Sequence, residues 1–112
     1  MNDCIFCKIA AGEVKSEIVY QDDRVCAFKD LNPQAPVHIL IIPKTHLEGI
    51  NSASPSDESL LGHMLIVGRE LARKNGIDST GYRILTNSGK DAGQVVNHLH
   101  FHLLGGQRLK PI

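Results

Sequence analysis

The chain has 112 residues, of which 42% are hydrophobic and 21% charged, and its 12 Lys and Arg residues balance its 12 Asp and Glu residues. This length suits one domain over residues 1–112, and the balanced charge excludes a general electrostatic attraction to nucleic acid or to a membrane. No apolar run approaches the roughly 20 residues that span a bilayer. Because residues 1–4 lack the basic and apolar regions of a signal peptide, we expect a cytoplasmic protein. Its three cysteines are then thiols or metal ligands rather than disulfides.

The N-terminal part of the chain predicts a short helix followed by the first strands of a sheet. Residues 4–12 form the helical turn, which Gly12 ends. Three strand-like runs follow, at residues 16–20, 25–29 and 37–42. A hairpin turn at residues 21–24 joins the first two runs, and a turn with two prolines at residues 30–36 precedes the third. The third run is the richest in β-branched residues, which indicates a central strand that Pro43 closes.

A long amphipathic helix is predicted after Ser54. Ser54 is a favourable N-cap, and Pro55 fits the first helical position. Apolar residues then recur at helical spacing, namely Leu60, Leu61, Met64, Leu65, Leu71 and Ala72. The helix stops at Asn75-Gly76. Gly68 lies on or near the apolar stripe, where a missing side chain allows another backbone to approach closely.

Two further strands, at residues 82–86 and 98–104, complete the predicted elements. A polar loop with several glycines, residues 87–97, connects them. Because only one long helix separates the strands, most neighbouring strands must be joined by hairpins. We therefore predict an α+β fold with a mainly antiparallel five-stranded sheet, one long helix and a short N-terminal helix.

Histidines alternate with apolar residues in the last predicted strand. The order is His98, Leu99, His100, Phe101, His102, Leu103 and Leu104. Because successive side chains of a strand point to opposite faces, the three imidazoles share one face and start roughly 6 to 7 Å apart. The apolar residues hold the other face against a core.

Three interpretations of this histidine face are open. It could be a solvated β-face, or a metal site, since histidines two apart on a strand can bind one ion. The third interpretation is nucleophilic catalysis on phosphorus. An imidazole with a reference pKa of ~6.5 is often uncharged at neutral pH, so it can attack an electrophile without a metal. Neighbouring imidazoles could then stabilise phosphate charge or protonate a leaving group.

Two polar segments support the phosphate interpretation without deciding it. Residues 87–94 could place an amide side chain and bare backbone N–H groups beside an anion, or could be a flexible connection. Asp30 follows a strand and precedes the proline-rich turn. It could accept hydrogen bonds from the hydroxyls of a sugar, and an Asx turn explains it equally well.

The chain resembles the histidine triad (HIT) superfamily, and within it the histidine triad nucleotide-binding proteins. The alternation at residues 98–104 is the signature of that superfamily. Flanking segments are similar too, at residues 28–38, 41–44, 81–83 and 105–106. The resemblance extends from Asp3 to Gly106.

The resemblance implies a homodimeric hydrolase of purine nucleoside 5′-phosphoramidates and aminoacyl adenylates, with conjugates of AMP or GMP as substrates. His100 would attack the α-phosphorus and become transiently nucleotidylated, while the main-chain carbonyl of His98 holds its other nitrogen. His102 and His38 would contact the phosphate and the leaving group. The remaining expected contacts are Asp30 with the ribose, Phe6, Ile9, Phe28 and Leu31 with the base, and Asn87 and Gly93 with the phosphate. Those four apolar residues could also be ordinary core.

Two other functions fit the same residues. One is a dinucleoside polyphosphate hydrolase or nucleotidylyl transferase of the superfamily, and the other is a nucleotide-binding interaction module that needs no turnover. The chain also departs from the nucleotide-binding branch at Val95, where that branch usually has a serine that donates to the phosphate. The backbone N–H of Val95 can remain as a donor. The short segment after Gly106 has no tryptophan, which affects the expected leaving-group specificity.

Cys4 and Cys7 have the spacing of metal ligands, and two buried or surface thiols are the alternative. Some superfamily members hold structural zinc with such a pair, a histidine after the Pro-Lys segment and the first histidine of the triad. The matching set here is Cys4, Cys7, His46 and His98. We favour zinc at this set and expect no cofactor for catalysis itself. Cys26 is expected in the core, and His63 at the surface or an interface.

Overall fold

The computed structural model describes residues 3–112, and the first two residues of the segment tested for a signal peptide lie outside it. Within this range five strands form one antiparallel sheet in the order β1-β2-β3-β5-β4. The strands are β1 (Ile18–Gln21), β2 (Val25–Lys29), β3 (Val37–Pro43), β4 (Tyr82–Leu85) and β5 (Phe101–Gly105). The helices are α1 (Ile5–Ala10) and α2 (Glu58–Lys74), with 3-10 turns at Ile50–Ser52, Pro55–Asp57 and Lys90–Ala92. The predicted α+β fold and the central position of β3 are confirmed.

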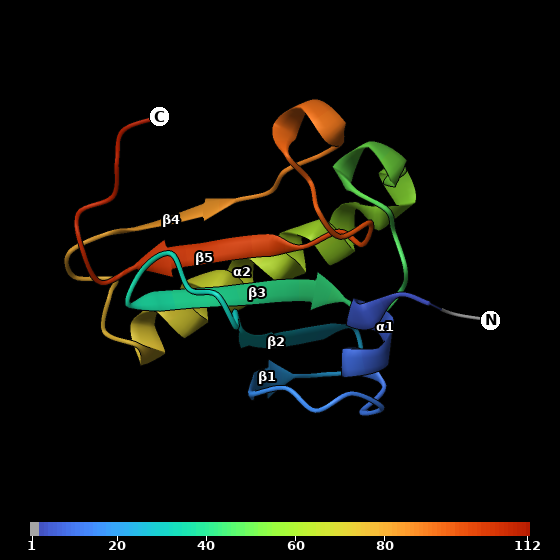
Figure 1. Cartoon of the computed structure of the whole chain (residues 1–112), viewed down its shortest axis with the longest axis horizontal. Coiled ribbons are helices and arrows are strands. Elements are labelled where there is room, and N and C mark those ends of the chain that lie inside the picture. Colours follow the sequence, from blue (N-terminus) through green and yellow to red (C-terminus); the bar gives the residue numbers. More distant parts are fainter. Residues whose placement is uncertain (1–2) are drawn as a thin grey trace.

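The two helices lie on opposite faces of the sheet (Figure 1). In β2, Val25 and Ala27 join the core under α2, whereas Cys26 and Phe28 join the smaller core under α1. This division follows from the alternation of side chains along a strand. Cys26 is therefore a core residue, as expected, and burial raises the pKa of its thiol. No helix within residues 3–112 is long and apolar enough to cross a membrane.

The last strand begins later than predicted. It starts at Phe101, so His98 and His100 precede it instead of belonging to it. The backbone of this segment is bonded elsewhere, because Leu99 N–H donates to Leu47 O at 2.6 Å and His100 O accepts from Thr86 Oγ1 at 2.8 Å. Smaller corrections apply to the first, third and fourth strands, predicted at 16–20, 37–42 and 82–86 and found at 18–21, 37–43 and 82–85.

The predicted start of the long helix is confirmed in its chemistry, although its first turn is a 3-10 turn. Ser54 N–H donates to Asp57 Oδ2 at 2.9 Å, and Pro55 follows at the first position. Gly68 meets the sheet as predicted, since a Cβ there would lie 2.8 Å from Ile84 Cδ1. The prediction for Leu65 is wrong, because this side chain is 48% exposed. Leu65 follows the buried Met64 by about 100° around the helix, which turns it away from the sheet.

Asp22 fastens the β1–β2 hairpin to α2. Its Oδ1 accepts hydrogen bonds from the backbone N–H groups of Arg24 and Val25, both at 2.8 Å. Its Oδ2 lies 2.6 Å from Tyr20 Oη and 2.6 Å from His63 Nε2. His63, expected at the surface or an interface, is half-buried against this carboxylate. Burial by itself would raise the pKa of Asp22, but the four hydrogen bonds outweigh it and lower the pKa below its usual range.

Replacing Asp22 with Asn tests this attachment. A carboxyl whose pKa falls on folding stabilises the fold above its unfolded pKa of ~3.9, and this contribution is lost as the pH falls towards the folded value. We expect Asp22→Asn to lower the free energy of unfolding by about 1–3 kcal/mol at pH 7 and by less at pH 3. Urea unfolding at both pH values measures this, with the neighbouring Asp23→Asn as control. An equal deficit at both pH values would contradict the interpretation.

Candidate active site and metal centre

A cleft of about 490 Å³ opens between α1, the end of β2 and the loops that precede β3 and β5. All the residues predicted to be catalytic or to bind nucleotide line it, namely Phe6, Ile9, Phe28, Asp30, Leu31, His38, Asn87, Gly93, Val95, His100 and His102. They come from segments far apart in the chain, so the fold brings the whole predicted set together. Another hollow, about 550 Å³ and lined by the segment after β5, contains none of them.

The wall of the cleft is apolar in its depth and at its rim. Phe6, Ile9 and Phe28 are buried, and the rings of Phe6 and Phe28 meet edge to face at 5.4 Å between centroids. These three residues are therefore both core and cleft lining. At the rim, Leu31 is 95% exposed and Val95 is 90% exposed, so neither belongs to the core. Such a cleft presents an inner apolar surface that suits a flat ring.

The tautomer of the buried His100 is defined by one hydrogen bond. Its Nδ1 lies 2.7 Å from the main-chain oxygen of His98, an atom that can only accept, so Nδ1 carries the proton. The Nε2 atom is consequently the one with the free lone pair. The His100 ring lies 5.1 Å from the Phe6 ring and 5.0 Å from the His102 ring, measured between centroids. This is the arrangement that a nucleophilic imidazole requires.

His38 and His102 lie side by side at the floor of the cleft. His38 Nε2 is 2.9 Å from His102 Nδ1 and 3.4 Å from Asp30 Oδ2. Burial, together with the neighbouring His100 and His38, lowers the pKa of His102 to about 4, against the opposing effect of Asp30. Burial also lowers the pKa of His38, again opposed by Asp30. Both imidazoles are therefore neutral at pH 7.

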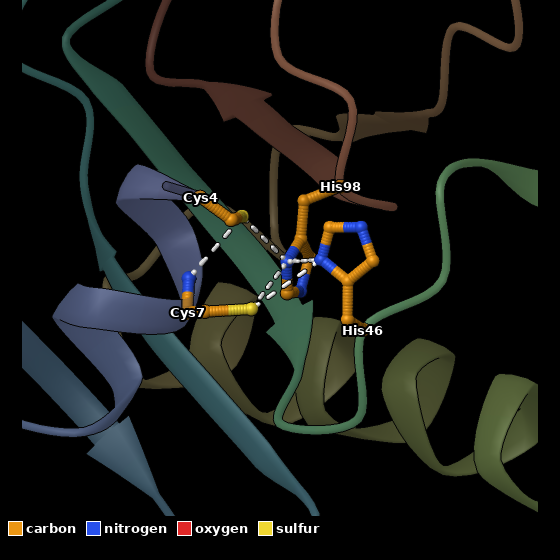
Figure 2. Close-up of side chains that lie close together, drawn as sticks. All are labelled: Cys4, Cys7, His46 and His98. Atoms are coloured by element: carbon orange, nitrogen blue, oxygen red, sulfur yellow. Dashed lines mark hydrogen bonds between the residues drawn. The ribbon is translucent and has the colours of Figure 1, made fainter. Parts of the chain in front are cut away.

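His98 leaves the cleft and turns towards the N-terminal cysteines (Figure 2). Its Nε2 lies 2.9 Å from Pro43 O, which fixes the proton on Nε2 and leaves the lone pair of Nδ1 facing the cluster. Cys4 Sγ is 3.1 Å and Cys7 Sγ 3.4 Å from this Nδ1. His46 Nδ1 lies 3.2 Å from it and 3.3 Å from Cys7 Sγ. The structure thus brings together all four predicted metal ligands.

The geometry of this cluster fits a tetrahedral ion. All four ligand atoms lie within 4.8 Å of one another. Tetrahedral zinc with N and S ligands at ~2.0–2.3 Å separates its ligand atoms by roughly 3.3–3.8 Å. The contacts of the cluster are close to this range. Asp30, His38 and His102 form a second group whose ligand atoms are as close.

Asp30 combines both of its proposed interpretations, whereas the loop before β5 is not a flexible connection. Asp30 Oδ1 accepts from Asn32 N–H at 2.8 Å, which is an Asx turn, while the residue also lines the cleft. The loop is braced rather than loose, because Gln94 Oε1 accepts from Gly89 N–H at 2.8 Å and Gln94 Nε2 donates to Glu48 O at 2.6 Å. Gln94 was missed as a site residue, since nothing in the sequence indicates that its amide spans the loop.

The family model described as the HIT domain matches residues 11–109. The chain belongs to the HIT family. A purine nucleoside phosphoramidase of Escherichia coli (strain K12) is 47% identical over 110 residues, which cover 98% of this chain and 92% of that protein.

Solved HIT structures have the same fold. A histidine triad protein from Clostridium difficile superposes with a TM-score of 0.97 and 46% identity, covering 100% of this chain and 97% of that one. A HIT family hydrolase from Legionella pneumophila Philadelphia 1 has a TM-score of 0.95 and 44% identity, covering 96% of each chain. These relatives also support the expected enzyme class, a hydrolase.

Proposed function

We propose that this HIT protein hydrolyses the P–N bond of purine nucleoside 5′-phosphoramidates and the acyl phosphate bond of aminoacyl adenylates. The observation that carries the proposal is the single tautomer of His100, whose Nε2 lone pair faces a cleft of nucleotide size. The similarity to a relative named purine nucleoside phosphoramidase supports it.

The proposed reaction has two steps. His100 Nε2 attacks the α-phosphorus, the bond from phosphorus to the leaving nitrogen breaks, and the amine departs after taking up a proton. Water then attacks the phosphorus of the nucleotidylated His100, and the P–N bond to Nε2 breaks. The hydroxyl goes to phosphorus, and the remaining proton of the water balances the one carried off by the amine. For a phosphoramidate the products are a nucleoside monophosphate and an amine, with Nε2 restored. For an aminoacyl adenylate the bond from phosphorus to the carboxylate oxygen breaks instead, and the products are AMP and the amino acid.

The cleft residues supply binding for the rest of the substrate. Phe6, Ile9 and Phe28 offer the apolar wall for a purine, as we infer from their burial and edge-to-face packing. Asp30 lines the cleft, where its carboxylate would accept hydrogen bonds from the ribose hydroxyls. The exposed Leu31 would cover one edge of the base. The proposed phosphate contacts come from Asn87, Gly93 and the main-chain N–H of Val95.

Replacing the nucleophile tests the mechanism. We expect His100→Ala to reduce the turnover of adenosine 5′-phosphoramidate by at least ~1,000-fold, because the covalent route is lost, while AMP binding persists on the apolar wall. Mass spectrometry of rapidly quenched wild-type protein should show a nucleotidylated chain that the variant lacks. His63→Ala, outside the cleft, serves as the matched control.

Three outcomes would point elsewhere. Full turnover by His100→Ala would refute the nucleophile. Preferential cleavage of dinucleoside polyphosphates would favour that hydrolase or a nucleotidylyl transferase. Tight AMP binding by the wild type without any turnover would favour an interaction module.

We also propose that Cys4, Cys7, His46 and His98 hold a structural zinc ion. Four protein ligands close the coordination shell, so the ion would attach α1 to the sheet and take no part in bond breaking. The lone pair of His98 Nδ1 that faces both sulfur atoms supports this ligand set.

Elemental analysis tests the zinc site. We expect about one zinc per chain in protein purified without a histidine tag, and loss of zinc together with a lower unfolding temperature in Cys7→Ser. Cys26→Ala removes a thiol from the core instead and should keep the zinc. A wild-type protein that contains no stoichiometric zinc would refute the proposed zinc site.

We further propose that the chain forms a homodimer through α2 and β4. β4 is an edge strand of the sheet with the partly exposed Tyr82, and Leu65 of α2 is 48% exposed. Paired edge strands and a covered apolar helix face are common in dimers.

Light scattering measures the assembly. We expect twice the chain mass of 12.3 kDa for the wild type and a monomer for Leu65→Glu with Tyr82→Glu, because two buried charges oppose association. The control, Ile18→Glu, changes an exposed residue at the opposite edge, β1, and should remain dimeric. A wild type that is only monomeric at working concentration would refute the dimer.

A further inference from the structure

His38 is held by hydrogen bonds at both of its ring nitrogens. Its side chain is only 3% exposed, although it lines the floor of the cleft. The main-chain N–H of Gln34 lies 3.0 Å from His38 Nδ1. On the other side of the ring, Nε2 lies 2.9 Å from His102 Nδ1. His38 therefore has little surface with which to touch a substrate, and its influence must pass through its partners.

The direction of these hydrogen bonds is determined by Gln34. A main-chain N–H can only donate, so His38 Nδ1 must present its lone pair and His38 must carry its proton on Nε2. Only one proton fits between two nitrogen atoms 2.9 Å apart. Because His38 Nε2 supplies that proton, His102 Nδ1 carries none. A neutral His102 then has its proton on Nε2.

We propose that the main-chain N–H of Gln34 sets the tautomer of His38 and thereby holds His102 as an Nε2–H donor at the cleft floor. Gln34 and His38 are then positioning residues, and His102 is the group that meets the substrate. His100 and His102 acquire opposite characters by this arrangement. His100 presents a lone pair at Nε2, whereas His102 presents an N–H, so one ring attacks and the other donates to phosphate oxygen.

The turn around Gln34 is built to keep this N–H in place. Asp30 N–H donates to His38 O at 3.0 Å, which closes the loop between β2 and β3. Gln34 Nε2 donates to Asn32 O at 3.1 Å, and Asn32 N–H is itself bonded to Asp30 Oδ1. The Asp30 carboxylate, 3.4 Å from His38 Nε2, further favours the proton at that atom.

The same tautomer argues against a metal ion at Asp30, His38 and His102. An ion would need the lone pair of His38 Nε2, and the displaced proton cannot move to Nδ1 while Gln34 N–H points at it. His98 shows the reverse case, because the carbonyl of Pro43 keeps its proton on Nε2 and leaves Nδ1 open towards the cysteines. Among residues 3–112, the tautomer of His38 thus excludes a metal ion at the cluster on the cleft floor, whereas the tautomer of His98 is compatible with one at the cluster with the cysteines.

The decisive measurement is ¹⁵N NMR of the histidine rings in the full-length, metal-loaded protein at pH 7. We expect a protonated Nε2 and an unprotonated Nδ1 in both His38 and His102, and the opposite pattern in His100. Gln34→Ala keeps the main-chain N–H and should keep these signals. Protonation of Nδ1 in wild-type His38 or His102 would overturn the proposal, whatever the variants do.

Removing the N–H tests its consequence for catalysis. Gln34→Pro deletes this donor, so we expect a mixture of His102 tautomers and a ~10-fold lower kcat/KM, as for the loss of one hydrogen bond. Gln34→Ala keeps this N–H and loses only the side-chain bond to Asn32 O, so its kcat/KM should fall clearly less than that of Gln34→Pro. His38→Gln places a fixed amide donor beside His102, and in that background Gln34→Pro should cost little more. If Gln34→Pro lowers kcat/KM equally with and without His38→Gln, Gln34 N–H does not act on His102 through His38 and the proposal is overturned.

The kinetic experiment rests on the proposed function, whereas the NMR experiment does not. If the tautomers are as predicted but the protein turns over no phosphoramidate, the role of Gln34 N–H in setting them is supported and the proposed function is refuted. Normal turnover with the opposite tautomers would do the reverse.

Discussion

His98 is the constraint on which the rest of this site depends. It is completely buried, and its two ring nitrogens and its carbonyl each have a separate partner. Its Nε2–H bonds to Pro43 at the end of β3, its Nδ1 faces the cysteines of α1, and its carbonyl accepts from His100. A displacement of this residue would therefore change both the orientation of the His100 ring and the position of the N-terminal helix. Its main-chain carbonyl is bonded to the His100 ring instead of to a neighbouring strand, so this residue lies outside the regular sheet.

The attachment of α1 matters because that helix is too short to be stable alone. It spans six residues, fewer than the ~12 that an isolated helix needs in water. It nevertheless carries Phe6, which contacts the rings of Phe28, His98 and His100. The same short helix thus contributes both to the apolar wall of the cleft and to the cysteine cluster. What secures Cys4 and Cys7 also secures the surface offered to a purine.

Patterns that depend on side-chain type alone were readable from the sequence. The alternation around His100, the N-cap at Ser54 and the ligand spacing of Cys4 and Cys7 each have a local physical signature. The extent of the last strand was not readable, because its start depends on where the backbone of residues 98–100 finds partners. Leu65 was misplaced for a related reason, since a helix of mixed polarity leaves the angular limits of its buried stripe to the packing partner.

The least predictable features are those made by the backbone. The Gln34 N–H, the Pro43 carbonyl and the His98 carbonyl each select the protonated nitrogen of one histidine, and main-chain groups are the same at every position of a sequence. In the mechanism we propose, four imidazoles of identical chemistry thereby take four roles: metal ligand, nucleophile, donor and positioning group. If tautomers rather than residue types distinguish these roles, replacing a neighbouring residue with proline can alter catalysis without touching a histidine. The chemistry of such a site is encoded as much in the turns that aim the peptide groups as in the triad itself.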